Sequence, residues 1–315
     1  MKICITLCTR GRPVMLARCL DSLPPAIEHA SRELSVSVVV VENGEKSGAE
    51  ACVAERRQQL QIDYIFEPAE GIPFARNAGV EAALKRGCDW IIFIDDDEWV
   101  AEDWLTRLVE ASRIYDADVL NGPVIKEFGE TAPDWLPRYR LGSRATGMLL
   151  SSAPTNNTMV TSEIFAGSPD REYPGLRFDT RLRLTGGSDS ELFQRVRSCD
   201  RKIVWVEEAQ VFEEYPARRA TLGWHMERNI RRASCGVLIE RLGGRPQFKY
   251  AMRGAINSGI EGIGRIARGT FLLIVDRRKA WRDYGLGVLS LASCYGYLRG
   301  LMGIYSAPYS VIDGH

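Results

Sequence analysis

The sequence predicts an α/β fold in which a mixed, mostly parallel sheet is flanked by helices and followed by a helical C-terminal extension. Short apolar runs alternate with helical patterns through the first 125 residues, and one such run, Ile91–Ile94, ends in the acids Asp95–Glu98. Repeated strand and helix units at this spacing are typical of parallel sheets covered on both faces. At 315 residues and 45% hydrophobic content, the chain has enough apolar residues for a large core in one domain or in two.

The elements of the first half are read from apolar spacing and from end signals. The chain opens in a strand at residues 3–7, and Pro13, at a favourable first position, begins a helix. The apolar residues of this helix recur at helical spacing at Leu16, Cys19, Leu20 and Leu23. The further predicted elements are a strand at 36–41, a helix at 49–60, a strand at 62–66, a helix from Pro73, a strand at 90–94, a helix at 104–115 and a strand at 119–124.

The middle of the chain is less regular. Residues 127–143 contain prolines together with Trp135 and Tyr139 and predict a long loop, which in a compact domain is often functional. A short apolar stretch follows Asn157, and short strands at 203–206 and 211–212 precede the acids Glu213 and Glu214. We expect these strands to close the sheet.

Four consecutive acids at residues 95–98 indicate a ligand site. Close carboxylates repel one another by roughly 1 kcal/mol per pair in water, so a bound cation is a physical reason to place them together. In open α/β sheets ligands bind at the carboxyl ends of strands, and hard oxygen ligands suit Mg²⁺ or Mn²⁺ bridging to a substrate phosphate. The alternative is an acidic turn before the next helix, with Asp103 as its N-cap; the metal is favoured because a cap needs only one acid.

A second acid follows a flexible pair of glycines. Gly186 and Gly187 precede Asp189 at the mouth of a predicted helix, which gives this carboxylate freedom to approach a substrate. The alternative is that Asp189 is simply an acid favoured by the helix dipole.

The net charge of zero hides an asymmetry. Residues 217–315 hold 16 Lys and Arg against 6 Asp and Glu, so this part carries +10 and residues 1–216 carry −10. An acidic body joined to a basic tail suggests two surfaces with different partners. Aromatic residues are not interleaved with the basic ones as a nucleic-acid stacking surface needs, so we expect no nucleic acid partner.

The segment Gly285–Ser306 is mostly apolar and follows a basic cluster at residues 277–282. Its length is just enough to span a bilayer, but Arg299 and several serines disfavour insertion. Three alternatives remain open: a membrane span, interfacial helices on anionic lipid, and helices packed against the preceding α/β domain. The basic excess favours the interfacial helices.

The cysteines and histidines of the sequence indicate a cellular compartment and disfavour one kind of metal site. The eight cysteines form no CxxC pair and several lie beside apolar segments, so we expect reduced thiols in a cytosolic protein. Three histidines are too few to favour an imidazole-built zinc site. The pattern of a signal peptide is absent, and we expect the chain to carry none.

Seven short stretches occur along the first 235 residues: 8–13, 41–44, 72–77, 93–104, 122–124 with 131–135, 186–193 and 213–224. In this order they resemble family 2 glycosyltransferases of the GT-A fold, and among them the bacterial exopolysaccharide glucosyltransferases. The resemblance implies a GT-A domain at residues 1–235 and leaves 236–315 as a basic, apolar helical extension that we expect to associate with a membrane.

The resemblance also implies a donor site. The residues that would bind the nucleotide sugar are Thr9, Arg10, Glu42, Arg76, Asp95 and Asp96. Glu42 stands where the family usually has an Asp that accepts from the uracil ring, and Asp95 would lie near the ribose. Asp97 would bind the divalent metal, Mg²⁺ or Mn²⁺, while Asp96 and Glu98 are candidates for supporting roles. For Arg76 an ion pair on a helix surface is the alternative.

On the acceptor side, the resemblance assigns Asp189 as catalytic base, although Ser188 stands where relatives commonly have Glu. Trp135 is a candidate sugar platform or packing residue, and Asn157 a second candidate for acceptor binding. Glu213 matches a family position near the active site, where metal coordination and structural hydrogen bonding are equally open.

The function implied is inverting transfer of a hexose from a UDP-sugar to a lipid-linked oligosaccharide in surface or exopolysaccharide synthesis, at the cytoplasmic face of the inner membrane. Two alternatives remain. A sugar nucleotidyltransferase needs a Gly-rich loop after the first strand, and Gly11-Arg12-Pro13 is too short a version. A non-catalytic nucleotide-sugar-binding protein is favoured if Asp97 or Asp189 lies far from the pocket.

Overall fold

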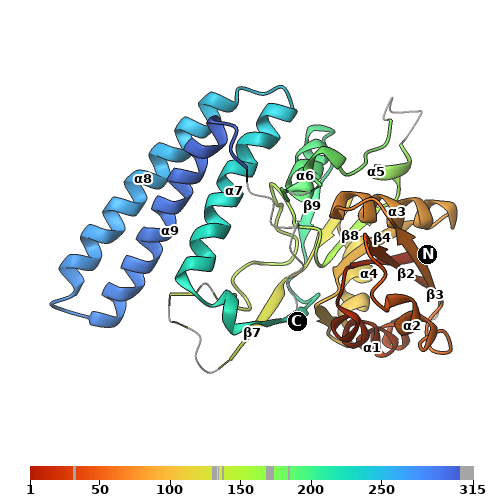
Figure 1. The fold of residues 1–315 in the computed structure, drawn as a ribbon. Coiled ribbons are helices and arrows are strands. Elements are labelled where there is room, and N and C mark those ends of the chain that lie inside the picture. The colour runs from red at the N-terminus through yellow and green to blue at the C-terminus, as the bar shows by residue number, and fades with distance from the viewer. Residues whose placement is uncertain are drawn as a thin grey trace.

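The computed structural model describes residues 1–30, 33–129, 133, 135–136, 138–167, 174–183 and 185–305. Its first half contains β1 (Lys2–Thr9), α1 (Pro13–His29), β2 (Ser35–Asn43), α2 (Ala49–Ala54), β3 (Ile62–Glu67), α3 (Ile72–Lys85), β4 (Trp90–Asp95), β5 (Glu98–Val100), α4 (Trp104–Ile114), β6 (Val119–Asn121) and β7 (Val124–Phe128) (Figure 1). There follow β8 (Thr158–Thr161), α5 (Glu163–Ala166), η2 (Thr180–Leu182), α6 (Ser188–Ser198), β9 (Ile203–Trp205), β10 (Val211–Tyr215), η3 (Ala217–Arg219), α7 (Leu222–Leu242), α8 (Gln247–Leu272) and α9 (Arg277–Leu301).

The main sheet is mixed and mostly parallel, as the sequence predicts. It has seven strands in the order β3-β2-β1-β4-β8-β6-β9, of which β8 alone runs antiparallel to both of its neighbours. A second sheet has the order β5-β10-β7 and lies beside the carboxyl end of β4, because only Asp96 and Asp97 separate β4 from β5. The end of β4 is therefore enclosed by two sheets.

The predicted strand at 119–124 is wrong as a single element. Residues 119–121 pair with β8 and β9 in the main sheet, whereas residues 124–128 pair with β10 in the second sheet. Gly122 and Pro123 separate them. Proline has no N–H to donate to a ladder, and a Cβ on Gly122 would lie 2.2 Å from the Ala209 carbonyl oxygen. The chain thus changes sheet at a close backbone contact that only glycine permits.

The core consists of two hydrophobic clusters on opposite faces of the main sheet. Ile3, Ile5 and Leu7 of β1 belong to the cluster with α1 and α4, while Cys4 belongs to the cluster on the other face, where α3 and α6 pack. Figure 1 shows α3 and α1 on opposite sides of this sheet. The four predicted apolar positions of α1, Leu16, Cys19, Leu20 and Leu23, are all fully buried. Alternating side chains that are buried on both faces are expected of parallel strands covered by helices.

Three long helices form the C-terminal part of the described chain. α8 and α9 make a hairpin that extends away from the sheets, and α7 packs against α9 (Figure 1). The predicted domain boundary at residue 235 lies inside α7, which continues to Leu242. The apolar segment from Gly285 lies mostly in α9 and packs on α7 and α8; Ser306 is outside the described residues. Within the described ranges, no helix is long and apolar enough to cross a membrane.

All eight cysteines lie within the described residues, and each is a free thiol. Five of them are buried, whereas Cys8 and Cys294 are half-buried and Cys199 is exposed.

Small residues set the spacing of the α8–α9 hairpin. A Cβ on Gly262 would lie 2.7 Å from Cγ of Leu291 and 3.0 Å from the carbonyl oxygen of Gly287. Gly264, two residues further along α8, has open space around the same position. The two glycines therefore occupy opposite environments on one helix.

We predict that Gly262→Ala destabilises the protein and that Gly264→Ala does not. The first substitution overpacks the helix contact, at a cost of about 1–3 kcal/mol, whereas the second only adds helix propensity, worth about 0.5–1 kcal/mol. Urea unfolding followed by circular dichroism measures both. Equal stabilities of the two variants would contradict this account of the hairpin.

Candidate active site

The predicted acids lie where the sequence places them, at the carboxyl end of a central strand. Asp95 ends β4, Asp96 and Asp97 form the turn that follows, and Glu98 begins β5. Asp103 does occupy the N-cap position of α4, but its side chain pairs with Arg107 at 2.9 Å and caps nothing. The alternative interpretation, in which the acids form a turn with Asp103 capping α4, is therefore wrong.

Neighbouring strand ends hold the acidic turn in place. Thr9, at the end of β1, donates to Asp96 at 2.7 Å, and Arg12 lies 3.2 Å from Asp96 and 3.3 Å from Asp97. Asp96 is buried and supports the turn from inside, and its predicted contact with the nucleotide sugar stays a prediction. No role is predicted for Arg12 from the sequence. Its position shortly after β1, the strand that pairs with β4, is the feature that could have indicated its contact with the acids.

The crowded carboxylates are electrostatically strained. Enclosure in the site raises the pKa of Asp95 to about 7 against the attraction of Arg76, and repulsion by Asp97 and Asp96 adds to it. Its side chain keeps 45% exposure, so the enclosure is that of a cleft and not of a core. Burial, partly offset by Arg12, raises the pKa of Asp96 to about 6.

Glu98 belongs to the interior. Its oxygens accept from Nδ2 of Asn156 at 2.9 Å and from the backbone N–H of Asp95 at 3.0 Å, and burial raises its pKa well above the usual range. Two of the four acids, Asp96 and Glu98, are thus internal supports, and Asp95 and Asp97 are left to face a ligand.

The oxygen atoms of this site suit a hard divalent cation whose remaining coordination positions are filled by a bound ligand. Asp97 has 18% of its side chain exposed, and its oxygens, with those of Asp95, are hard donors. Within the described ranges no group of three or more His, Cys, Asp or Glu could hold a metal ion by itself. Mg²⁺ commonly binds through one or two carboxylates plus substrate phosphates, so an incomplete protein set fits this chemistry. The assignment of Asp97 as metal ligand stays a prediction.

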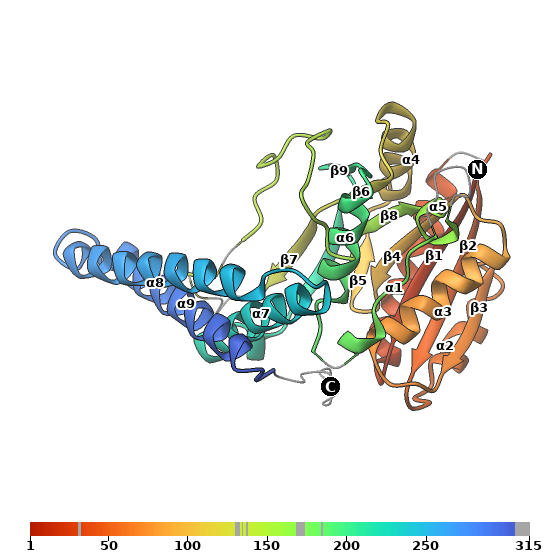
Figure 2. The same cartoon turned by 90° about the horizontal axis from the view of Figure 1, so that it is seen from above.

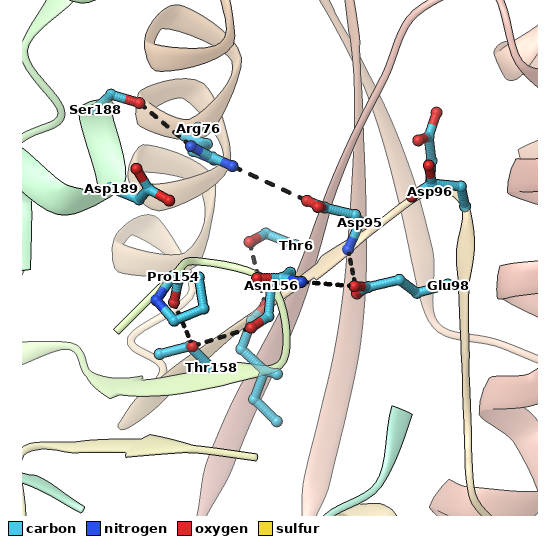
Figure 3. A network of polar contacts seen from close by, with 12 residues as sticks. Thr6, Arg76, Asp95, Asp96, Glu98, Pro154, Asn156, Thr158, Ser188 and Asp189 are labelled. Atoms are coloured by element: carbon cyan, nitrogen blue, oxygen red, sulfur yellow. Dashed lines mark hydrogen bonds and ion pairs between the residues drawn. The ribbon is translucent and has the colours of Figure 1, made fainter. Parts of the chain in front are cut away.

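Arg76 joins the two halves of the site. From α3, its guanidinium lies 4.0 Å from Asp95 and donates to Oγ of Ser188 at 3.3 Å (Figure 3). Arg76 is buried, so the alternative of an ion pair on a helix surface is wrong. This one side chain connects the end of β4 to the start of α6.

Asp189 lies in the first turn of α6, next to Ser188. Gly186 and Gly187, at φ 80° and 81°, are held in the left-handed region, so the predicted flexible pair forms a defined turn. A Cβ on Gly187 would lie 2.7 Å from Sγ of Cys235, which shows how closely α7 approaches this turn. The Asp189 carboxylate accepts from the N–H of Ser190 at 2.7 Å and lines a cavity of about 1130 Å³ that Arg76 also lines.

Glu42 and Arg10, both predicted to contact the nucleotide, already have protein partners. Buried Glu42 accepts from Ser47 at 2.6 Å and from Tyr64 at 2.6 Å. Burial would raise its pKa, but these hydrogen bonds lower it overall. Arg10 pairs with Glu70 at 3.1 Å. Their contact with a nucleotide stays a prediction; in this structure they organise the loops after β1 and β2.

The two residues predicted to bind the acceptor, Asn157 and Trp135, both contact other parts of the protein. Asn157 is fully buried: its Oδ1 accepts from Trp104 at 2.7 Å, and its Nδ2 donates to the carbonyls of Pro123 and Ala209. The structure therefore corrects its assignment, because no polar atom of this amide is left for a sugar. Trp135 packs edge-on against His225 of α7, with ring centres 5.2 Å apart, and also contacts α9 at Gly285. Trp135 thus makes packing contacts with the helical region, and its contact with an acceptor sugar stays a prediction.

Glu213 lies in β10, opposite Glu98 in the strand register. Arg219 donates to it at 3.1 Å, and Lys126 lies 3.8 Å away. Burial raises the pKa of Glu213 against the attraction of Lys126, and Asp97 adds repulsion. Glu213 is therefore electrostatically part of the acidic site, and its structural ion pairs are established.

A cluster of arginines on α7, which no sequence motif marks, also contributes to the site. Arg228 and Arg232 line both the cavity at Asp189 and an adjoining cavity of about 500 Å³, and Arg231 lines the first. None of the three has a carboxylate partner among the described residues. Burial and the neighbouring Arg232 lower the pKa of Arg228. Three arginines outnumber the two acids that line the same cavity, Asp189 and Glu240, so this part of the cavity favours an anionic group.

The sequence model described as glycosyl transferase family 2 matches residues 3–168. The chain belongs to this family. The succinoglycan biosynthesis protein ExoM of Rhizobium meliloti (strain 1021) is 31% identical over 260 residues, which cover 81% of each chain. ExoO of the same organism is 28% identical over 190 residues, 57% of this chain and 53% of ExoO.

Solved structures show the fold. The structure of S. aureus TarS residues 1–349 has a TM-score of 0.55 at 13% identity and covers 97% of this chain and 93% of that one. TarS in complex with UDP-GlcNAc gives a TM-score of 0.54 at 11% identity, with the same coverage. The family 2 chain thus has the GT-A fold with a C-terminal helical region, as the sequence predicts.

We predict that Asp95→Asn makes the stability less dependent on pH. Because the folded state raises the pKa of Asp95 to about 7, the stability that this group contributes is present at low pH and is lost as the pH rises through 7. The parent should therefore lose more stability between pH 5 and pH 8 than the variant. Urea unfolding with a chelator present measures this, with Asp116→Asn as an exposed control. A parent and an Asp95→Asn variant with the same pH dependence would refute the electrostatic account.

Proposed function

We propose that this family 2 glycosyltransferase transfers a hexose, with inversion, from a UDP-sugar to a lipid-linked oligosaccharide in exopolysaccharide synthesis. The name of its relative ExoM supports the pathway. TarS, a structural neighbour, has been solved in complex with UDP and with UDP-GlcNAc, which supports a UDP-sugar donor.

The observation that carries the proposal is the bridge made by Arg76. It connects Asp95, at the acidic turn, with Ser188, which immediately precedes Asp189 (Figure 3). One side of the site therefore offers carboxylates for a metal-bound diphosphate, and the other offers a carboxylate in a cavity. A transfer reaction needs this separation of leaving group and base.

The chain's own residues supply the remaining chemistry. Asp189 would accept the proton of the acceptor hydroxyl as its oxygen attacks the anomeric carbon opposite the leaving nucleoside diphosphate, so that the configuration inverts. A carboxylate is adequate as base because the hydroxyl becomes acidic as the new bond forms. Arg76 would hold Asp95 charged and keep the start of α6 in place. A divalent cation at Asp97, when bound, would neutralise the charge that develops on the diphosphate.

The arginine cluster of α7 supports a phosphate-bearing acceptor. A lipid-linked sugar carries a phosphate or diphosphate between its lipid and its first sugar, and guanidinium groups bind phosphate well. Arg228, Arg231 and Arg232 line the cavity that contains Asp189, so an acceptor phosphate would bind on the side of the base. The basic C-terminal part of the chain supports a place at the cytoplasmic face of the inner membrane.

The two alternative functions lack comparable support. A nucleotidyltransferase would need a longer glycine-rich loop after β1 than Gly11-Arg12-Pro13. A non-catalytic binding protein would not need Asp189 connected, through Ser188 and Arg76, to the acidic turn.

We predict that Asp189→Asn binds UDP-sugar like the parent but transfers about a hundredfold to ten-thousandfold more slowly, the range for loss of a general base. Binding is measured by calorimetry, and turnover by release of UDP in the presence of a crude lipid acceptor. Asp116→Asn, at an exposed position, is the control for an Asp to Asn change and should keep parental turnover. If Asp189→Asn transfers at the parental rate, the base assignment is wrong.

We predict that Asp97→Ala loses the effect of Mn²⁺ on UDP binding. In the parent, a thermal-shift assay should show stabilisation by UDP that increases with Mn²⁺ and disappears with EDTA, because a ligand bound only by the native state raises its stability. In the variant, the affinity for UDP with Mn²⁺ should fall by about tenfold or more, equivalent to about 1.4 kcal/mol. Parental UDP binding that ignores EDTA would contradict metal dependence.

A further inference from the structure

The helix α8 exposes a continuous apolar face. Large side chains on it are strongly exposed, with Ile260 at 68%, Ile263 at 66%, Phe271 at 68% and, just past its end, Ile274 at 89%. The face runs at helical spacing through Phe248, Met252, Ile256, Ile260, Ile263, Ala267, Phe271 and Ile274. Such a stripe is what an amphipathic helix presents to an apolar partner.

This apolar face is not the one that packs inside the protein. α8 contacts α9 through small buried residues, Ala251, Ala255, Gly262 and Gly269. At 100° per residue these lie on the opposite side of the helix from Ile260. α9 lies between α7 and α8, so the outer side of α8 faces away from the rest of the described chain (Figures 1 and 2).

Basic residues surround the apolar face. Residues 247–282 hold eight Lys and Arg against two Asp and Glu. Three of these basic residues are in ion pairs: Arg265 with Glu261 at 2.8 Å, Lys279 with Asp276 at 3.0 Å and Arg268 with Asp283 at 2.6 Å. The net charge of the range is therefore still positive, at +6. Trp281, 68% exposed, lies just beyond the turn of the hairpin, where an aromatic ring suits a membrane interface.

The charge decides between the two partners that an apolar helix face suits. A second copy of the chain would bring two sets of like charges together around the contact, which is unfavourable. An anionic bilayer offers apolar acyl chains to the isoleucines and negative headgroups to the flanking arginines and lysines. The described helices are too polar to span, so the contact would be a surface one.

We propose that the outer face of α8, together with the α8–α9 turn, binds the surface of a membrane that contains anionic lipid. α8 lies along the interface with Ile260, Ile263, Phe271 and Ile274 inserted among the lipids. The basic residues around them contact the headgroups. This inference does not depend on the transferase reaction, because it concerns a surface without catalytic residues.

Vesicle flotation of the purified chain tests the proposal without any sugar nucleotide. We use vesicles of phosphatidylcholine alone and vesicles of equal parts phosphatidylcholine and phosphatidylglycerol. The chain should float with the second kind, and binding should weaken with added salt. Ile260→Glu with Ile263→Glu should reduce the partition coefficient by about tenfold or more, since each buried methylene contributes to partitioning. Ile114→Glu, at a site on α4 that is 71% exposed, is the matched control and should bind like the parent.

Circular dichroism and thermal unfolding establish that both variants fold. The proposal is overturned if the α8 double variant binds anionic vesicles like the parent, or if the parent binds neither kind of vesicle. It is also overturned if the parent forms a dimer that the double variant lacks while neither binds lipid, since the face would then serve a second copy. Unchanged release of UDP by the α8 double variant would leave the proposed transferase function standing, so the two proposals fail separately.

Discussion

The contact between Arg76 and its two partners is the interaction on which the site depends. A buried guanidinium is costly unless it is paired and hydrogen-bonded, and Arg76 meets this demand with Asp95 on one side and Ser188 on the other. Because Asp95 ends a strand and Ser188 begins a helix, satisfying one charge fixes the distance between the acidic turn and Asp189. The polar site is thereby held by rigid elements on both sides.

Much of this arrangement follows from local patterns in the sequence. The run Ile91–Ile94 predicts a buried strand, and the parallel pairing of β4 with β1 then places Thr9 beside the acids. Pro13 and the apolar spacing after it predict α1. Gly186, Gly187 and Asp189 predict a polar turn at a helix start, and the structure has one. These predictions hold because each depends on neighbours in sequence or on the two faces of one sheet.

Other features depend on contacts that no local pattern records. The break at Gly122 is set by the backbone of Ala209, far along the chain. Asn157 looks polar and available, but Trp104, Pro123 and Ala209 take every polar atom of its amide. The arginines of α7 read as an ordinary solvated helix surface until the fold places Arg228 over the cavity that contains Asp189. In each case the decisive partner comes from a distant segment.

The C-terminal helices α7, α8 and α9 are consequently in contact with the candidate active site and do not form an independent domain. Cys235 of α7 packs so closely on Gly187 that the turn before Asp189 tolerates no side chain there. The same helix carries Arg228 into the cavity and packs against α9, which holds α8 on the outside. Packed helices therefore connect α8, through α9 and α7, with the turn that precedes Asp189. On this geometry, a lipid-linked acceptor and the membrane that contains it would engage connected parts of one structure.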